Sequence, residues 1–160
     1  MLKLSVGNML DNLKKYKVVL ASNSPRRKEL LAGLGIDYEV KTLPDIDESF
    51  PGGLSEVETA TYIARAKADV YRNIMQSDEL IITADTIVWL DGEVMGKPVD
   101  EEDARRMLRA LSGKTHQVIT GVCLMTLDSQ KAFATVTDVT FCHLSEEEID
   151  KVYNTTHLPN

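Results

Sequence analysis

The chain has 160 residues, 43% of them hydrophobic and 27% charged, which fits one globular domain that needs no disulfide framework. Its formal net charge of −7 argues against a nucleic-acid polymer or an anionic membrane as the main partner, because both normally require a basic surface. No apolar run approaches the ~18 residues of a membrane span, and residues 1–15 do not form a signal peptide. We therefore expect a cytoplasmic protein.

The first predicted elements are a strand and a helix. Residues 17–21 form a nearly all-apolar run rich in β-branched side chains, as expected of a buried strand. Ser24 is a good N-cap and Pro25 a good first helical residue, so a helix should begin there. Gly35 is a natural C-terminal cap, which predicts a helix over 25–34.

The first turn of this helix carries three cations. Arg26, Arg27 and Lys28 have the wrong sign for a helix N-terminus, where each should cost roughly 0.3 to 1 kcal/mol against the helix dipole. A bound phosphate chain would offset this cost, since free backbone amides and guanidinium groups both bind it. The helical repeat puts Arg27 on the apolar face with Leu30, facing inward. The alternative is a surface helix whose arginines are solvated.

An acidic loop follows a strand predicted over 36–42. Residues 43–54 combine prolines and glycines with the carboxylates of Asp45, Asp47 and Glu48. One of these carboxylates would hold a divalent cation against phosphates, since magnesium prefers one or two carboxylates plus substrate oxygens. The alternative is a solvated surface loop.

A longer helix is predicted over 55–75. Ser55 and Glu58 form a capping box at its start. Lys67 lies in the middle of the apolar stripe of this helix, where it either extends its stem to solvent or reaches into a polar pocket. The helix taken alone favours the first of these two arrangements.

The run 80–84 predicts a strand that ends at Asp85, and a hairpin with an Asp-Gly turn is predicted over 86–95. We expect Asp85 to act as a general base, because sites in α/β folds form at strand ends and burial there tunes a carboxylate. The alternative role is a residue of the turn. Lys67 and Lys97 would add positive charge for phosphates.

The remaining predicted elements are a helix between Asp100 and Gly113, strands over 115–126 and 131–141, and a last helix over 145–153. The order β-α-β-α-β-β-α-β-β-α contains too many hairpins for a purely parallel sheet. We therefore predict an α/β fold with a mixed sheet, rich in antiparallel hairpins and flanked by helices.

We divide the chain into a leader over 1–16, either helical or irregular, and a single domain over 17–160. The two cysteines, Cys123 and Cys142, form no zinc or redox motif. We expect both to be buried, reduced thiols within strands.

Four sequence blocks carry a resemblance to a known family. They are Leu-Ala-Ser-Asn-Ser-Pro-Arg-Arg at Leu20–Arg27, Ala-Asp-Thr-Ile-Val at Ala84–Val88, Gly-Lys-Pro at Gly96–Pro98 and Leu-Ser-Gly-Lys-Thr-His-Gln-Val at Leu111–Val118. From about Val18 to Tyr153 the chain resembles the Maf family of septum-formation-inhibitor-like nucleoside triphosphate pyrophosphatases. The resemblance implies a nucleotide-binding cleft in a fold similar to inosine triphosphate pyrophosphatase. It also implies hydrolysis of a nucleoside triphosphate to monophosphate and pyrophosphate with a divalent metal cation, Mg or Mn.

The resemblance also implies roles for individual residues. Asp85 matches the proton acceptor of the family, and Lys67 and Lys97 match its catalytic lysines. Ser22 and Arg27 match its phosphate-binding positions. On this basis water would attack the α-phosphorus while the cations hold the triphosphate.

Metal binding and substrate choice are carried over in the same way. Glu48 and Asp85 match the metal site, with Asp47 as the alternative to Glu48. Arg26 and Thr86 match positions that distinguish the dTTP/UTP subfamily, because the subfamily resembling 7-methyl-GTP pyrophosphatase usually carries tryptophan and glutamine there. The chain therefore resembles enzymes that act on dTTP, UTP and modified pyrimidine nucleotides.

The family continues beyond the last predicted helix into a block resembling Asp-Lys-Ala-Gly-Ala-Tyr-Gly-Ile-Gln, whose glutamine marks substrate choice. The 160 residues do not contain this block, so we expect the domain to lack its C-terminal segment and to select its base less strictly. A homodimer is compatible with the family. The functional alternatives are a nucleotide-binding regulator of septum formation with little turnover and a phosphohydrolase that removes only the terminal phosphate.

Overall fold

The computed structural model describes residues 15–156 and contains the ten predicted elements in the predicted order. They are β1 (Lys17–Leu20), α2 (Pro25–Gly33), β2 (Tyr38–Val40), α3 (Glu56–Tyr71), β3 (Glu79–Leu90), β4 (Glu93–Met95), α4 (Glu101–Leu111), β5 (Thr115–Met125), β6 (Gln130–Thr140) and α5 (Glu146–Thr156). The predicted leader lies almost wholly outside the described residues. No helix among the described residues is long and apolar enough to cross a membrane.

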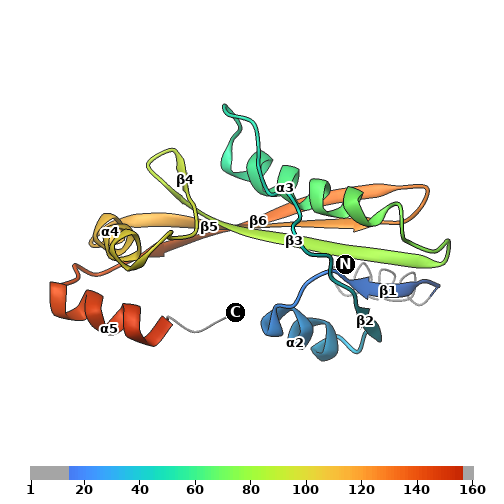
Figure 1. Ribbon diagram of the computed structural model, residues 1–160, viewed down its shortest axis with the longest axis horizontal. Helices are drawn as coiled ribbons and strands as arrows, with labels where there is room; N and C mark the ends of the chain where they lie inside the picture. The colour runs from blue at the N-terminus through green and yellow to red at the C-terminus, as the bar shows by residue number, and fades with distance from the viewer. Residues whose placement is uncertain (1–14, 157–160) are drawn as a thin grey trace, which may run out of the picture.

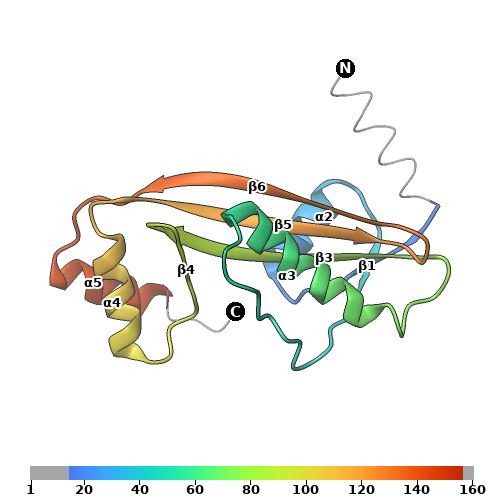
Figure 2. The ribbon, with the colours of Figure 1, turned by 90° about the horizontal axis from the view of Figure 1, so that it is seen from above.

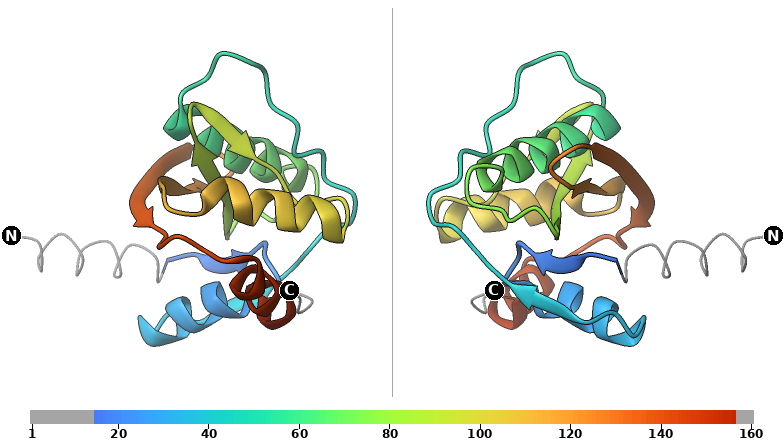
Figure 3. Two further views of the ribbon diagram at one scale, coloured as in Figure 1. Left: turned by 90° about the vertical axis from the view of Figure 1, so that its left-hand side faces the viewer. Right: turned by 90° about the vertical axis from the view of Figure 1, so that its right-hand side faces the viewer.

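The strands form one mixed sheet in the order β2-β1-β3-β5-β6, with β4 paired to β3. β1 runs parallel to β2 and β3, whereas β3, β5 and β6 form an antiparallel series. Helix α3 covers one face of this sheet, and α2 and α5 lie on the other (Figure 1). Seen end-on, these helices and the sheet form separate layers (Figure 3). The mixed α/β prediction is therefore confirmed.

Helix α3 packs closely on β3 and β5, as the view from above shows (Figure 2). Its buried face carries small residues, among them Ala60, Ala64 and Ala68, which let the helix backbone approach the sheet. The approach is closest at Gly121, where a Cβ atom would lie 2.3 Å from the carbonyl oxygen of Ala60. Thr83 Oγ1 then donates a 2.7 Å hydrogen bond to the carbonyl oxygen of Ala64. This contact ties α3 to the middle of β3.

The prediction of a strand that ends at Asp85 is wrong, because β3 continues unbroken to Leu90. Strand β5 pairs with it from Ile81 to Trp89 and keeps it extended. The other edge of β3 is shared by β1, which pairs as far as Ile82, and by β4, which pairs from Val88. Between these two strands, no described strand pairs with that edge. Asp85 therefore lies where β1 ends, not where β3 ends, and we call this stretch the open edge.

Two smaller predictions also need correction. Helix α2 has no fully buried residue, and Leu30 and Leu34 are exposed, so its apolar face is only partly covered among the described residues. Cys123 is buried as predicted, but Cys142 is exposed because it lies in the connection after β6. Both thiols are free.

Helices α4 and α5 pack together through ion pairs on their facing sides. Arg109 makes two 2.9 Å hydrogen bonds to the carboxylate of Glu146, and Arg105 pairs with Asp150. Ile149 of α5 is buried. The structure confirms the three predicted helix starts, at Ser55, Asp100 and Ser145. Each of these side chains accepts a hydrogen bond from the backbone N–H of the residue three positions later.

Candidate functional site

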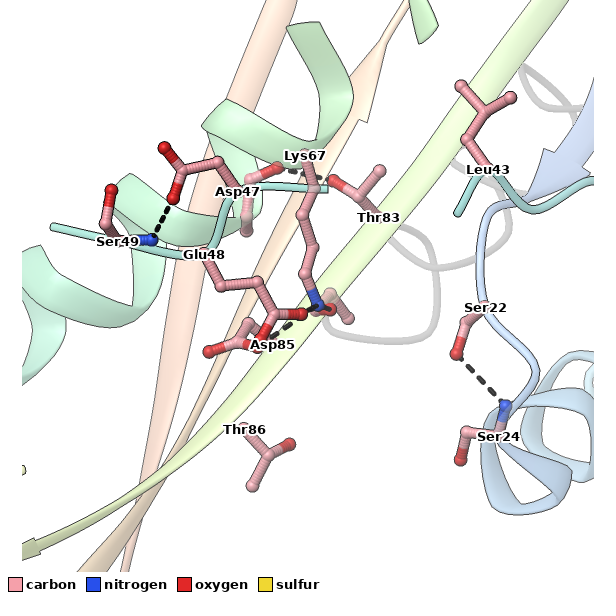
Figure 4. A network of polar contacts seen from close by, with 12 residues as sticks. Ser22, Ser24, Leu43, Asp47, Glu48, Ser49, Lys67, Thr83, Asp85 and Thr86 are labelled. Atoms are coloured by element: carbon pink, nitrogen blue, oxygen red, sulfur yellow. Dashed lines mark hydrogen bonds and ion pairs between the residues drawn. The ribbon is translucent and has the colours of Figure 1, made fainter. Parts of the chain in front are cut away.

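Three polar side chains meet on the α3 side of the open edge. The ammonium of Lys67 lies 3.1 Å from Asp85 Oδ1 and 3.0 Å from Glu48 Oε1. It also donates to the carbonyl oxygen of Ala84 at 3.3 Å. Figure 4 shows these side chains converging from α3, β3 and the acidic loop. Lys67 therefore reaches into a polar site, and the arrangement that its helix alone favoured is wrong.

The acidic loop is held in place where it leaves β2. The backbone N–H of Leu43 donates a 3.0 Å hydrogen bond to the hydroxyl of Tyr71, and Leu43 and Ile46 pack against the core beneath α3. These anchors bring Glu48 to Lys67. Asp47 instead pairs with Ser49, whose side chain and backbone N–H, the latter at 2.9 Å, both donate hydrogen bonds that lower the pKa of Asp47. Of the two candidate carboxylates, Glu48 is the one that reaches Lys67.

Burial sets the electrostatics of Asp85. Its side chain is 14% exposed, and loss of hydration raises the pKa of this carboxyl above the ordinary aspartate value. The charge and hydrogen bond of Lys67 act against this rise, while the charge of Glu48 adds to it. The carboxylate is therefore a stronger base than a solvated aspartate and is still paired with a cation.

Arg27 reaches the same edge from the opposite side of the sheet. Its Nη1 donates to Ser22 Oγ at 3.1 Å and its Nη2 donates to Thr86 Oγ1 at 3.2 Å. Ser22 is buried and also accepts the N–H of Ser24, which caps α2. Burial lowers the pKa of Arg27 and the charge of Asp85 partly restores it, but an arginine remains protonated. The prediction that Arg27 faces inward is confirmed.

A cavity of about 510 Å³ opens beside Arg27 on this second side of the sheet. It lies between the start of α2 and the faces of β3, β5 and β6, and its lining combines cationic, hydroxyl and apolar side chains. The lining residues are Ser24, Arg26, Arg27, Leu30, Thr86, Val118, Thr120, Thr135, Thr137 and Val139. Arg26 and Thr86, both predicted to govern substrate choice, therefore line one cavity.

The lining contributed by β5 and β6 was missed by the sequence reasoning. Thr135 and Thr137 alternate along β6, a pattern that places both hydroxyls on one face of a strand. That alternation was the available signal, but threonine is also a common strand residue. Only the pairing of Thr120 with Thr86 and Thr135 brings these side chains to the predicted site.

Lys97 is the predicted site residue that the structure does not bring to the others. It is exposed in the connection between β4 and α4, and it makes no hydrogen bond or ion pair with the described residues. Its expected catalytic role therefore has no support from the geometry of the free protein.

The carboxylates of Glu48 and Asp85 fit a divalent cation. Both already converge on one positive charge, the ammonium of Lys67, and each contacts it through one oxygen, Oε1 of Glu48 and Oδ1 of Asp85. Among residues 15–156, no group of three or more metal-ligating side chains occurs. A cation here would need substrate oxygens or water to complete its shell, which is the mode that magnesium prefers.

The chain was compared with known protein families and with related proteins. Residues 17–159 match the family described as "Maf-like protein". A dTTP/UTP pyrophosphatase of Phocaeicola vulgatus is 69% identical over 142 residues, which cover 89% of this chain and 74% of the relative. A dTTP/UTP pyrophosphatase of Porphyromonas gingivalis is 58% identical over 144 residues, covering 89% of this chain and 72% of the relative.

A solved structure confirms the fold. The nucleoside-triphosphatase, or dITP/XTP pyrophosphatase, of Mycobacterium abscessus superposes with a TM-score of 0.50 over 87% of this chain and 94% of that one. Its sequence identity is 16%, so the likeness concerns the arrangement of helices and strands alone.

Proposed function

This chain belongs to the Maf family, and we propose on that premise that it hydrolyses nucleoside triphosphates, dTTP and UTP in particular, to monophosphate and pyrophosphate. The relatives that are 58% to 69% identical are named dTTP/UTP pyrophosphatases. The observation that carries the proposal is the pairing of Lys67 with Asp85 and Glu48 at the open edge. It joins a largely buried carboxylate with raised pKa to a cation. Arg27, from the start of α2, reaches the same edge.

The triphosphate is proposed to cross the open edge. Arg27 and Ser22 contact it from the side of α2, and Lys67 contacts it from the side of α3. Arg27 supplies a guanidinium fork that suits phosphate oxygens, and the backbone amides that begin α2 add further donors. Lys97 is proposed to join them from its exposed loop once the phosphates are bound.

Asp85 is the proposed general base. It takes a proton from water as the water oxygen forms a bond to the α-phosphorus, and the bond from that phosphorus to the bridging oxygen breaks. Pyrophosphate then leaves with the electron pair of the broken bond. Such a base commonly contributes about 10² to 10⁴-fold in rate.

Glu48 and Asp85 are proposed to hold a divalent cation, Mg or Mn. Bound there, the cation would neutralise phosphate charge and polarise the oxygens of the triphosphate. The protein's own contribution is to bring the two carboxylates together, through the anchored loop and the β3 strand.

The wider proposals follow from the same assignment. We propose that residues 17–160 act as one catalytic domain, that the protein works in the cytoplasm and that its ligand is a free nucleotide and not a nucleic-acid polymer. A homodimer is proposed as the assembled state. Gel filtration with light scattering would measure the mass and decide between monomer and dimer.

The test is a panel of triphosphates with magnesium, scored separately for pyrophosphate and orthophosphate. We expect pyrophosphate, and in water labelled with oxygen-18 we expect the label in the monophosphate. Asp85→Asn should lower turnover by about 10² to 10⁴-fold while still binding UTP. Orthophosphate as the product would instead indicate a terminal phosphohydrolase, and binding without turnover by the unaltered protein would indicate a regulator.

A further inference from the structure

The cavity beside Arg27 extends beyond anything the phosphates require. Its volume of about 510 Å³ lies in the range of small-molecule sites, and away from the cations it is lined by β-strand side chains. These are the hydroxyls of Thr86, Thr120, Thr135 and Thr137 and the apolar side chains of Val118 and Val139. A planar, partly polar group attached to the phosphates would fit such a lining, since the lining offers both apolar side chains and hydroxyl groups.

A chain of hydrogen bonds leads from Arg27 into this cavity. Arg27 Nη2 donates to Thr86 Oγ1 at 3.2 Å, and Thr86 Oγ1 lies 3.0 Å from Thr120 Oγ1. Either hydroxyl could donate in the second bond, but the guanidinium can only donate in the first. Because Arg27 donates to one side of the Thr86 oxygen, the hydroxyl proton of Thr86 is favoured on the other side, where it points toward Thr120. Linked hydrogen bonds polarise one another in this way. The hydroxyl proton of Thr120 is then free to point into the cavity.

We propose that Thr120 determines base specificity by donating a hydrogen bond to a carbonyl oxygen of the bound pyrimidine. This inference rests on the proposed function, because it takes the ligand to be a pyrimidine triphosphate. Uracil and thymine carry an acceptor oxygen at position 4, where cytosine carries an amino group that donates. A donor that faces that amino group leaves both groups without an acceptor, which weakens binding. Thr120 therefore selects uracil and thymine against cytosine.

Arg26 strengthens this preference from the other wall of the cavity. It lines the same space and makes no hydrogen bond with the described residues, and its guanidinium also offers donors alone. A base edge rich in carbonyl oxygens satisfies both Arg26 and Thr120, whereas an amino group satisfies neither.

The central experiment compares kcat/KM for UTP and CTP in the Thr120→Val and Thr120→Ser variants. Valine keeps the shape of threonine and removes the hydroxyl, so the UTP-to-CTP ratio should fall by about tenfold. Serine keeps the hydroxyl and should keep most of the ratio. The matched control is Thr115→Val, because Thr115 lies on the same strand, bonds Thr140 through a 2.7 Å hydroxyl pair and is not part of the cavity lining. This control should leave the ratio unchanged.

A double variant tests the hydrogen-bond chain itself. If Thr86 orients the proton of Thr120, Thr86→Val already removes the preference, and adding Thr120→Val should lower the ratio little further. Independent effects that multiply in the double variant would overturn the chain.

Binding of the non-hydrolysable analogues α,β-imido-UTP and α,β-imido-CTP separates this inference from the proposed function. Loss of uridine preference in Thr120→Val supports the inference even if the unaltered protein releases no pyrophosphate, an outcome that would overturn the function alone. An unchanged preference in Thr120→Val, in binding and in turnover, would overturn the inference and leave the pyrophosphatase activity standing. Equal binding of both analogues by the unaltered protein would overturn it as well.

Discussion

Lys67 is the residue whose role depends most on its surroundings. Its side chain is 16% exposed and lies between two carboxylates, so most of its hydration has been replaced by Asp85, Glu48 and a backbone carbonyl. A buried pair of this kind adds little net stability, but removing one partner leaves the other charge uncompensated. The pairing therefore affects the ionisation of Asp85 more than the stability of the fold.

The first prediction at this scale concerns the titration of Asp85 without metal or substrate. In this free protein the deprotonated carboxylate, which is the form a general base needs, is present above the pKa of Asp85 and is lost as the pH falls through it. Because that pKa is raised, the loss should begin at a higher pH than for a solvated aspartate. Lys67→Met should raise this pKa further, since the charge of Lys67 lowers it.

Glu48→Gln is the control with the opposite sign, because the charge of Glu48 raises the pKa of Asp85. Carbon-13 NMR of the Asp85 carboxyl would measure the pKa in all three proteins. If both variants moved the titration midpoint in the same direction, the local charges would not set the pKa of Asp85, and a change of folding would be the explanation.

Lys67→Met should also reduce kcat/KM by about 10² or more.

At the scale of elements, the site depends on how closely α3 lies against β5. Gly121 is directly opposite Asp85 in the sheet, and its missing side chain leaves room for the backbone of Ala60 and Thr61. Lys67 lies on the same helix, fewer than two turns further on. The position of its ammonium therefore follows from an approach that only glycine permits.

Gly121→Ala should force α3 away from the sheet. The added Cβ atom would lie 2.3 Å from a carbonyl oxygen that cannot rotate aside, so we expect a loss of about 1 to 3 kcal/mol in the free energy of unfolding. The kcat/KM should fall too, because Lys67 moves with the helix. Urea unfolding and steady-state kinetics would measure the two effects.

Gly33→Ala provides the matched control, since a Cβ atom there meets nothing within 4 Å. It should leave stability unchanged or raise it by about 0.5 to 1 kcal/mol, as for alanine in place of glycine in a helix. Equal destabilisation by the two substitutions would contradict the role given to the close approach.

At the scale of the whole molecule, a basic site is set into an acidic protein. The formal net charge is −7, and a triphosphate is also an anion, so the distant field repels the ligand that Arg27 and Lys67 attract at short range. Salt screens the distant repulsion first, because the Debye length falls from about 30 Å at 0.01 M to about 8 Å at 0.15 M.

We therefore expect the association rate of a fluorescent, non-hydrolysable UTP analogue to rise by at least about twofold over this range of salt. Its dissociation rate should also rise, because the contacts with the cations weaken. Stopped-flow fluorescence would measure both rates, and an uncharged uridine derivative serves as the control with a flat response. A fall in the association rate would mean that the local cations already control the approach.

The sequence by itself determined the order of the elements and indicated the candidate residues. Helix caps such as Ser24 and Ser55 act over three or four residues, and the apolar runs of β1 and β5 follow periods that a chain carries locally. The order of elements, the mixed sheet and the inward direction of Arg27 could be predicted for that reason. The resemblance to the family then singled out Glu48 among the loop carboxylates and agreed with Asp85, which its place after an apolar run had already indicated.

The tertiary structure alone decided how these residues meet. Pairing with β5 keeps β3 continuous through Asp85. On the other edge of β3, β1 ends before Asp85 and β4 begins after it, which leaves the open edge between them. Neither feature leaves a local signal in the sequence. From its helix alone, Lys67 could extend to solvent. Its direction is set by the carboxylates of Glu48 in the loop and Asp85 in β3, which both contact its ammonium. Thr120 gained its role only through a neighbour 34 positions away, because sheet pairing joins residues that the sequence keeps apart.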